Sequence, residues 1–69
     1  MKNMRAVAYW DFYDSTTGEV LEKERLIKRG AMPTIGGLVI GIPGKPNAII
    51  RNFSFRGSKN NLLCYYVYV

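Results

Sequence analysis

The chain has 69 residues, carries 10 Lys+Arg against 5 Asp+Glu and contains no His, which gives a net charge of +5. This length predicts a single domain over residues 1–69. Cys64 is the only cysteine, so an internal disulfide, a Cys/His zinc site and an iron–sulfur site are excluded within one chain. Without histidine there is also no His-based triad or general base. We therefore expect no metal, no cofactor, no catalytic residues and no enzymatic activity.

Neither a secretion signal nor a membrane span is indicated by the sequence. Residues 1–8 carry charge but no continuous apolar core, unlike a signal peptide. The longest apolar stretch, residues 35–42, includes three glycines and is far shorter than the roughly 20 residues of a membrane helix. We expect a cytoplasmic protein without membrane contact.

The first half of the chain predicts a β-hairpin. Residues 4–13 read as a strand with apolar side chains at the even positions, and residues 14–18 read as a turn in which Gly18 takes a positive φ. Residues 19–29 have the charge order of a helix but no single apolar stripe, so a returning strand is favoured over a helix. That strand needs a bulge between Leu21 and Leu26 to place both leucines on one face.

The second half predicts three more strands. They cover residues 38–42, residues 47–56 and residues 62–69, separated by turns at residues 43–46 and 57–61. In the middle one, Ile49, Phe53 and Phe55 share a side. Five short strands with dense turns indicate an all-β fold, a small and strongly bent antiparallel barrel.

Three motifs match a known architecture. They are the Tyr-Asp-x-x-Thr-Gly-Glu hairpin from Tyr13 to Glu19, the Pro-x-x-Gly turn from Pro33 to Gly36, and the run Tyr-Tyr-Val-Tyr-Val at residues 65–69. With them the chain resembles the small SH3-like barrels of phage and mobile-element proteins; an OB-like barrel is the alternative. The resemblance implies a phage- or mobile-element-encoded protein and, above all, an architecture.

Charge is distributed unevenly along the chain. All five acids lie within the first 24 residues, so residues 1–24 sum to −2 and residues 25–69 to +7. An acid-free basic segment predicts binding of phosphates, nucleotides or an acidic protein surface; the alternative is that cations and acids pair on adjacent strands. The candidate anion-binding residues are Arg25, Lys28, Arg29, Lys45, Arg51, Arg56 and Lys59.

Aromatic residues form a second candidate surface. Tyr66 and Tyr68 share one face of the last predicted strand, and Tyr9 and Tyr13 extend that patch from the first strand. Exposed tyrosines suit base stacking and protein interfaces alike. The basic-flanked Phe-x-Phe at residues 53–55 loosely resembles a ribonucleoprotein motif, but we interpret both phenylalanines as core.

These features predict a non-enzymatic binding module that acts through protein–protein contact, as an inhibitor or accessory protein of a host partner. We expect it to be a homo-oligomer, because a chain this small without a disulfide or metal gains stability from self-association. The alternative function is binding of nucleic acid or nucleotides through residues 25–69.

Overall fold

The computed structural model describes residues 5–69, which form six β-strands and contain no helix. The predicted all-β class is thus confirmed. The strands are β1 (Ala8–Tyr13), β2 (Val20–Ile27), β3 (Leu38–Ile42), β4 (Lys45–Ile49), β5 (Asn52–Lys59) and β6 (Leu62–Tyr68). In the described part, no helix is long and apolar enough to cross a membrane.

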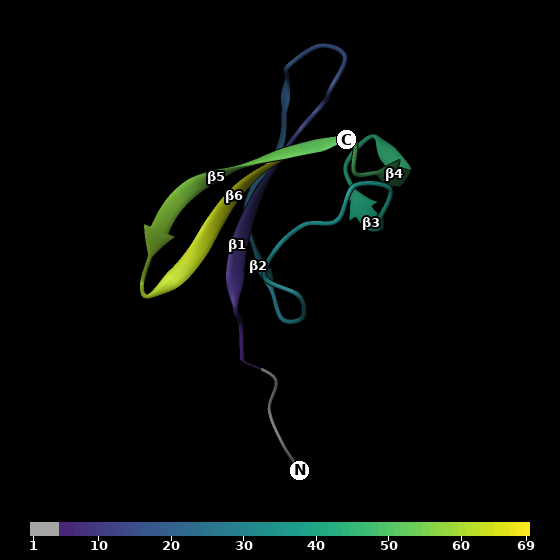
Figure 1. Cartoon of the computed structure of the whole chain (residues 1–69). Helices are drawn as coiled ribbons and strands as arrows, with labels where there is room; N and C mark the ends of the chain where they lie inside the picture. The colour runs from purple at the N-terminus through teal and green to yellow at the C-terminus, as the bar shows by residue number, and fades with distance from the viewer. Residues whose placement is uncertain (1–4) are drawn as a thin grey trace.

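The six strands belong to two sheets. Four of them form a sheet in the order β2-β1-β6-β5, and β3 and β4 form a separate hairpin (Figure 1). β1 and β6 run parallel, with Ala8 opposite Leu63 and Tyr13 opposite Tyr68. The prediction of five strands, all antiparallel, is therefore wrong in strand number and in this pairing. The order of the described strands is open at β2 and β5, and the hydrogen-bonded strands do not close into one barrel.

The first hairpin follows its local sequence. Ala8, Trp10 and Phe12 are buried, as their alternation predicts, whereas Met4 of the predicted strand lies outside the described residues. The Asp14 carboxylate accepts hydrogen bonds from the main-chain N–H groups of Thr16 and Thr17, and Gly18 has a φ of 78°. An Asp side chain that satisfies the turn and a glycine that closes it explain this loop.

Residues 20–27 form the favoured strand and not the alternative helix. The predicted bulge is confirmed, since the register with β1 shifts between Arg25 and Glu22; Glu24 has a φ of 51° there. Leu26, however, does not share a face with Leu21. It lies opposite Tyr9 on the outer side and is exposed, whereas Leu21 and Ile27 pack against the core.

The strand predicted over residues 47–56 is divided between the two sheets. The Ile50 N–H donates to the Gly37 carbonyl over 2.9 Å, and the Ile50 carbonyl accepts from Gly36. The next residue, Arg51, donates its N–H to the Tyr68 carbonyl. The main chain thus leaves the β3–β4 hairpin and joins β6 within two residues, because each sheet offers hydrogen-bond partners there.

The β5–β6 connection is tighter than predicted. Only Asn60 and Asn61 form the turn, with φ angles of 52° and 64°. Two positive φ angles in a two-residue loop are typical of the hairpin turns that match strand twist, and Asn tolerates them well. Gly57, assigned to the turn from the sequence, belongs to β5, next to a bulge that follows Phe55.

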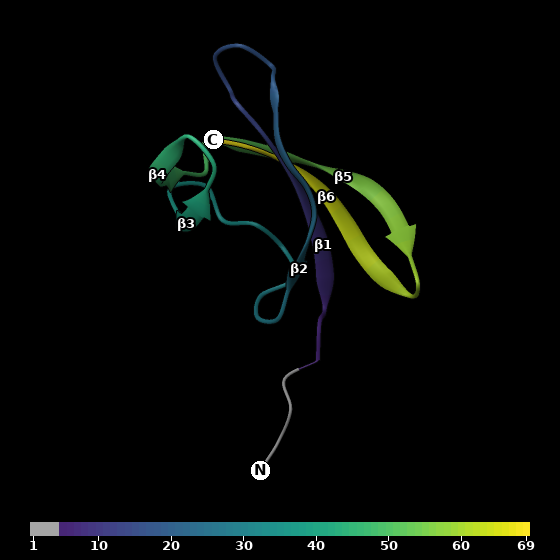
Figure 2. The ribbon, with the colours of Figure 1, turned by 180° about the vertical axis from the view of Figure 1, so that it is seen from behind.

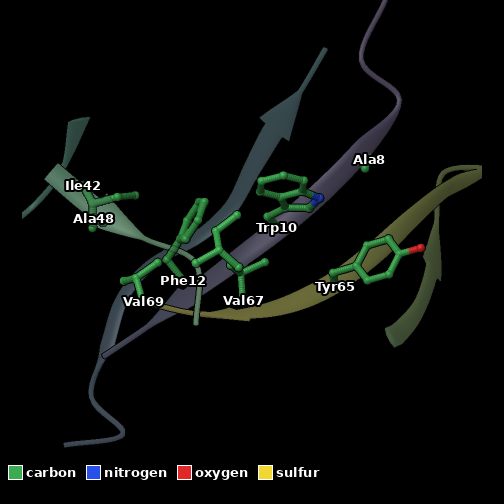
Figure 3. Close-up of a cluster of buried hydrophobic side chains, with 9 residues drawn as sticks. Ala8, Trp10, Phe12, Ile42, Ala48, Tyr65, Val67 and Val69 are labelled. Atoms are coloured by element: carbon green, nitrogen blue, oxygen red, sulfur yellow. The ribbon is translucent and has the colours of Figure 1, made fainter. Parts of the chain in front are cut away.

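The hydrophobic core lies between one face of the four-stranded sheet and the β3–β4 hairpin. In Figure 3, Phe12, Val67 and Val69 point toward Ile42 and Ala48 of the hairpin. Figures 1 and 2 both show the hairpin beside the end of the sheet near Val69, with the β5–β6 turn on the far side. The β3–β4 hairpin therefore covers only the part of this face that lies near Val69, and side chains on the rest of the face are exposed to solvent unless they pack against one another.

Candidate binding groove

A groove runs between the end of β2 and strand β3. Its volume is about 500 Å³, and it is bordered by residues at the end of β2 and just after it on one side and by β3 on the other. The lining residues are Trp10, Arg25, Leu26, Ile27, Lys28, Arg29, Leu38, Val39 and Ile40. Among the described residues, the lining thus combines aliphatic side chains with three cations and includes no acid.

Arg25 connects the two sides of this groove. Its guanidinium donates to the main-chain carbonyls of Ile40 and Gly41 over 3.0 and 2.8 Å. It also forms a two-point ion pair with Glu22, with distances of 3.0 and 2.7 Å, and its Cζ lies 5.4 Å from the centre of the Phe12 ring. Arg25 is therefore engaged within the fold and fastens the β3–β4 hairpin to the four-stranded sheet.

Lys28 and Arg29 follow β2 directly and are exposed. Within residues 5–69 neither forms an ion pair. Of the seven predicted anion-binding residues, these two retain free charges at the groove.

The other four-stranded face, opposite the core, carries all four candidate tyrosines. Tyr9 and Tyr13 alternate with the buried residues of β1, and in the parallel register Tyr13 lies opposite Tyr68 and Asp11 opposite Tyr66. The Tyr13 ring centre is 5.8 Å from that of Tyr66 and 5.7 Å from that of Tyr68. We call this surface, defined by Tyr9, Tyr13, Tyr66 and Tyr68, the tyrosine face.

An ion-pair network crosses the tyrosine face. Asp11 is 1% exposed; its carboxylate accepts the Glu24 N–H over 2.8 Å and Arg56 Nη1 at 3.2 and 3.3 Å. Arg56 also pairs with the Glu24 carboxylate, which accepts two 2.9 Å hydrogen bonds from Lys59. Asp11 thus fixes the β2 bulge, and two acids neutralise two cations.

The network stabilises the charged form of Glu24, Lys59 and Arg56. The hydrogen bond from Lys59, followed by that from Arg56, lowers the pKa of Glu24. The same contacts with Glu24 raise the pKa of Lys59 and of Arg56. In the turn, hydrogen bonds from Thr16 and Thr17 lower the pKa of Asp14.

The two remaining candidate cations lie elsewhere. Lys45 and Arg51 line a smaller hollow of about 340 Å³ beside β4. Lys45 forms an ion pair with Asp14 at 3.5 Å and donates to the Val69 carbonyl at 3.4 Å, whereas Arg51 is exposed. The structure therefore distributes the seven cations over at least three places, and four of them face acids of the first hairpin and β2.

The aliphatic wall of the groove was not among the sites predicted from the sequence. Leu38 and Ile40 of this wall are 60% and 69% exposed. A signal was present, because residues 38–40 are continuously apolar and a strand that is apolar on both faces needs a cover on both. Only one face of the β3–β4 hairpin is covered, by the four-stranded sheet, and Leu38 and Ile40 lie on the opposite, exposed face.

Phe53 and Phe55 were both expected in the core. Phe53 is partly buried and packs against it, whereas Phe55 is 59% exposed and its ring meets the Tyr65 ring edge-on at 5.5 Å. The expectation is correct for Phe53 and wrong for Phe55, because the β3–β4 hairpin does not reach that end of the sheet.

We compared the chain with known protein families, curated proteins and solved structures. No family model, curated protein or solved structure matches the chain.

Proposed function

We propose that this protein is a non-enzymatic binding module that acts through protein–protein contact and uses the groove between β2 and β3. The exposed aliphatic wall formed by Leu38 and Ile40 is the observation that carries the proposal. Exposed contiguous apolar surface with a polar rim is typical of interaction sites. A host protein that this module inhibits or assists is the partner class that fits.

Nucleic-acid or nucleotide binding is the second candidate, and one observation favours it: Lys28 and Arg29 are adjacent, exposed and without an acidic partner in the described chain. The arrangement of the other groups speaks against it. Base stacking needs aromatic rings near phosphate-binding cations, but the tyrosine face has its cations, Arg56 and Lys59, neutralised by acids.

Site-specific photo-crosslinking in the natural host tests the first candidate. A photoreactive amino acid placed at Ile40, in the groove wall, should capture one defined protein. The same group at Lys23, exposed on β2 outside the groove, is the matched control and should not. Equal capture from both positions, or capture of nucleic acid alone, would contradict the proposal.

A salt titration decides the second candidate. Phosphate contacts release counterions, so affinity for DNA or RNA should fall steeply with salt. Lys28→Glu with Arg29→Glu should then abolish a gel shift seen with the unmodified protein. Absence of any shift at about 50 mM salt rules this function out.

Self-association belongs to the same proposal. β5 is an open edge of the sheet, and its residues 52–55 carry no charge, whereas natural edge strands are often protected by lysines. Pairing of two β5 edges would give a dimer. Sedimentation equilibrium should then show a dimer that Ser54→Lys converts to monomer; a monomer in both cases would exclude this contact.

We further propose that the two sheets are an open relative of the small SH3-like barrel, encoded by a phage or mobile element. All-β architecture around one shared core supports the first part. A gene located among phage or mobile-element genes would support the second part, and a location within a metabolic operon would contradict it.

A further inference from the structure

We infer that the occupant of the groove is an extended protein segment in which apolar side chains alternate with carboxylates, added as a strand at the free edge of β2. This inference rests on the proposed function and names the partner chemistry. It follows from the charges at the groove, the nature of its walls and the direction of the main-chain groups of β2.

The charges select an acidic partner. Lys28 and Arg29 border the groove, and within residues 5–69 neither forms an ion pair and no acid lines the groove. Arg25 adds a third cation whose charge Glu22 already balances. An incoming carboxylate thus meets two unneutralised cations at a rim, where charge complementarity steers association and selects between partners.

A second copy of this chain does not supply such carboxylates. Each copy has a net charge of +5, and four of its five acids are held in ion pairs within the fold: Asp11, Asp14, Glu22 and Glu24. Only the exposed Glu19 has no such pair in the described part of the chain. Like charges would face each other across the contact, so the groove partner is a different protein.

The walls favour protein over nucleic acid. The exposed aliphatic side chains of the wall are Leu38 and Ile40, which offer no ring for a base to stack on. Trp10 is the aromatic residue of the groove, but it is 9% exposed and its indole N–H donates to the Ala31 carbonyl over 2.8 Å. Aliphatic walls accept aliphatic side chains.

The edge of β2 favours an extended conformation of the partner. The Ile27 carbonyl accepts the Val7 N–H, so it points toward β1. Main-chain groups alternate in direction along a strand, which turns those of Leu26 and Lys28 toward the free edge beside the groove. A strand added there pairs with these groups and directs every second side chain into the groove.

Fluorescence of Trp10 provides the test, because it is the only tryptophan and it lines the groove. The probe is a short synthetic peptide in which valine alternates with glutamate, titrated into the full-length protein. Two matched peptides alternate valine with lysine and serine with glutamate. We expect a saturable change in Trp10 fluorescence with the valine–glutamate peptide. The other two peptides should give no such change or bind at least tenfold more weakly, a difference in binding free energy of roughly 1.4 kcal/mol.

Variants assign the effect to the groove. Lys28→Glu should weaken the valine–glutamate peptide about tenfold, because a rim attraction becomes a repulsion, whereas Lys23→Glu makes the same charge change on β2 outside the groove and should alter affinity less than about twofold. Ile40→Ser should also weaken binding of this peptide. Because the Ile40 side chain is exposed, the unfolding midpoint of this variant should equal that of the unmodified protein.

The outcomes separate the two levels of the proposal. Binding of the valine–lysine peptide in place of the acidic one, with crosslinking at Ile40 retained, overturns the acidic partner and leaves the proposed function standing. Equal effects of Lys23→Glu and Lys28→Glu show non-specific attraction and overturn the inference. Binding of an oligothymidine that Lys28→Glu abolishes, with no peptide bound, overturns both.

Discussion

Replacement of Asp11 by alanine tests whether a buried carboxylate holds the β2 bulge in place. Asp11 is almost fully buried and accepts the Glu24 N–H over 2.8 Å. A hydrogen bond to a charged group contributes about 1.5–3 kcal/mol, and an orphaned N–H adds its own desolvation cost. We therefore expect Asp11→Ala to lower the free energy of unfolding by about 3 kcal/mol.

That loss is large for a chain of this size. A single core of fewer than about 70–80 residues rarely supplies more than 3–5 kcal/mol. If the unmodified chain has a free energy of unfolding of about 4 kcal/mol, the substitution leaves about 1 kcal/mol. The unfolded fraction at 25 °C then rises from roughly a thousandth to roughly a sixth.

Urea unfolding at pH 7, followed by far-ultraviolet circular dichroism, measures the effect. Asp11→Asn retains an oxygen for the Glu24 N–H and should cost about 1–2 kcal/mol. Glu19→Ala removes an exposed acid next to the same hairpin and should change stability by less than about 0.5 kcal/mol. If Asp11→Ala costs no more than Glu19→Ala, the carboxylate does not fix the bulge and the reasoning fails.

Three further predictions concern the core, the ion pairs and the last turn. Phe12→Ala removes a fully buried ring and should cost about 3–5 kcal/mol, enough to unfold the chain in calorimetry; a retained cooperative transition would contradict this. The pKa of Glu24 is lowered and that of Lys59 is raised, so the stability that their ion pair contributes should be complete between about pH 5 and 10. It should disappear as pH falls below 4.5, where Glu24 becomes protonated, and as pH rises above 10.5, where Lys59 loses its proton. Thermal melts across pH should show a smaller decrease of the melting temperature at acid pH in Glu24→Gln than in the unmodified protein. Asn61→Gly should raise stability by about 0.5–1 kcal/mol, since Asn-Gly suits two positive φ angles best, and a lower melting temperature would refute the turn assignment.

Local features of the fold could be predicted from the sequence. The alternation in β1 and the Asp14 turn each depend on neighbours a few residues apart. The tight turn predicted over residues 43–46 is shorter than expected: Pro43 and Gly44 form it, and Lys45 already pairs with Ile42 as the first residue of β4. The β2 bulge was also predictable, but its exact geometry was not. Leu26 points outward because Glu24 takes a positive φ to bring its N–H to Asp11, and that contact lies across the hairpin.

The candidate site was less accessible to sequence reasoning. The basic segment is visible in the sequence, yet Arg56 contacts Asp11 at the other end of the chain, so which cations remain free is a tertiary property. The open wall at Leu38 and Ile40 depends on how far the β3–β4 hairpin covers the sheet. No pattern within residues 38–42 encodes that coverage.

The parallel pairing of β1 and β6 has a consequence for how the protein is made. β6 lies between β1 and β5 in the sheet, yet it leaves the ribosome after every other described strand. Until then β1 has only β2 beside it, and Trp10 and Phe12 lack the Tyr65 and Val67 side chains that cover them. Such distant contacts close slowly, so the four-stranded sheet forms only after residues 62–68 have been synthesised, and a chain that stalls before residue 62 exposes its future core to chaperones and proteases.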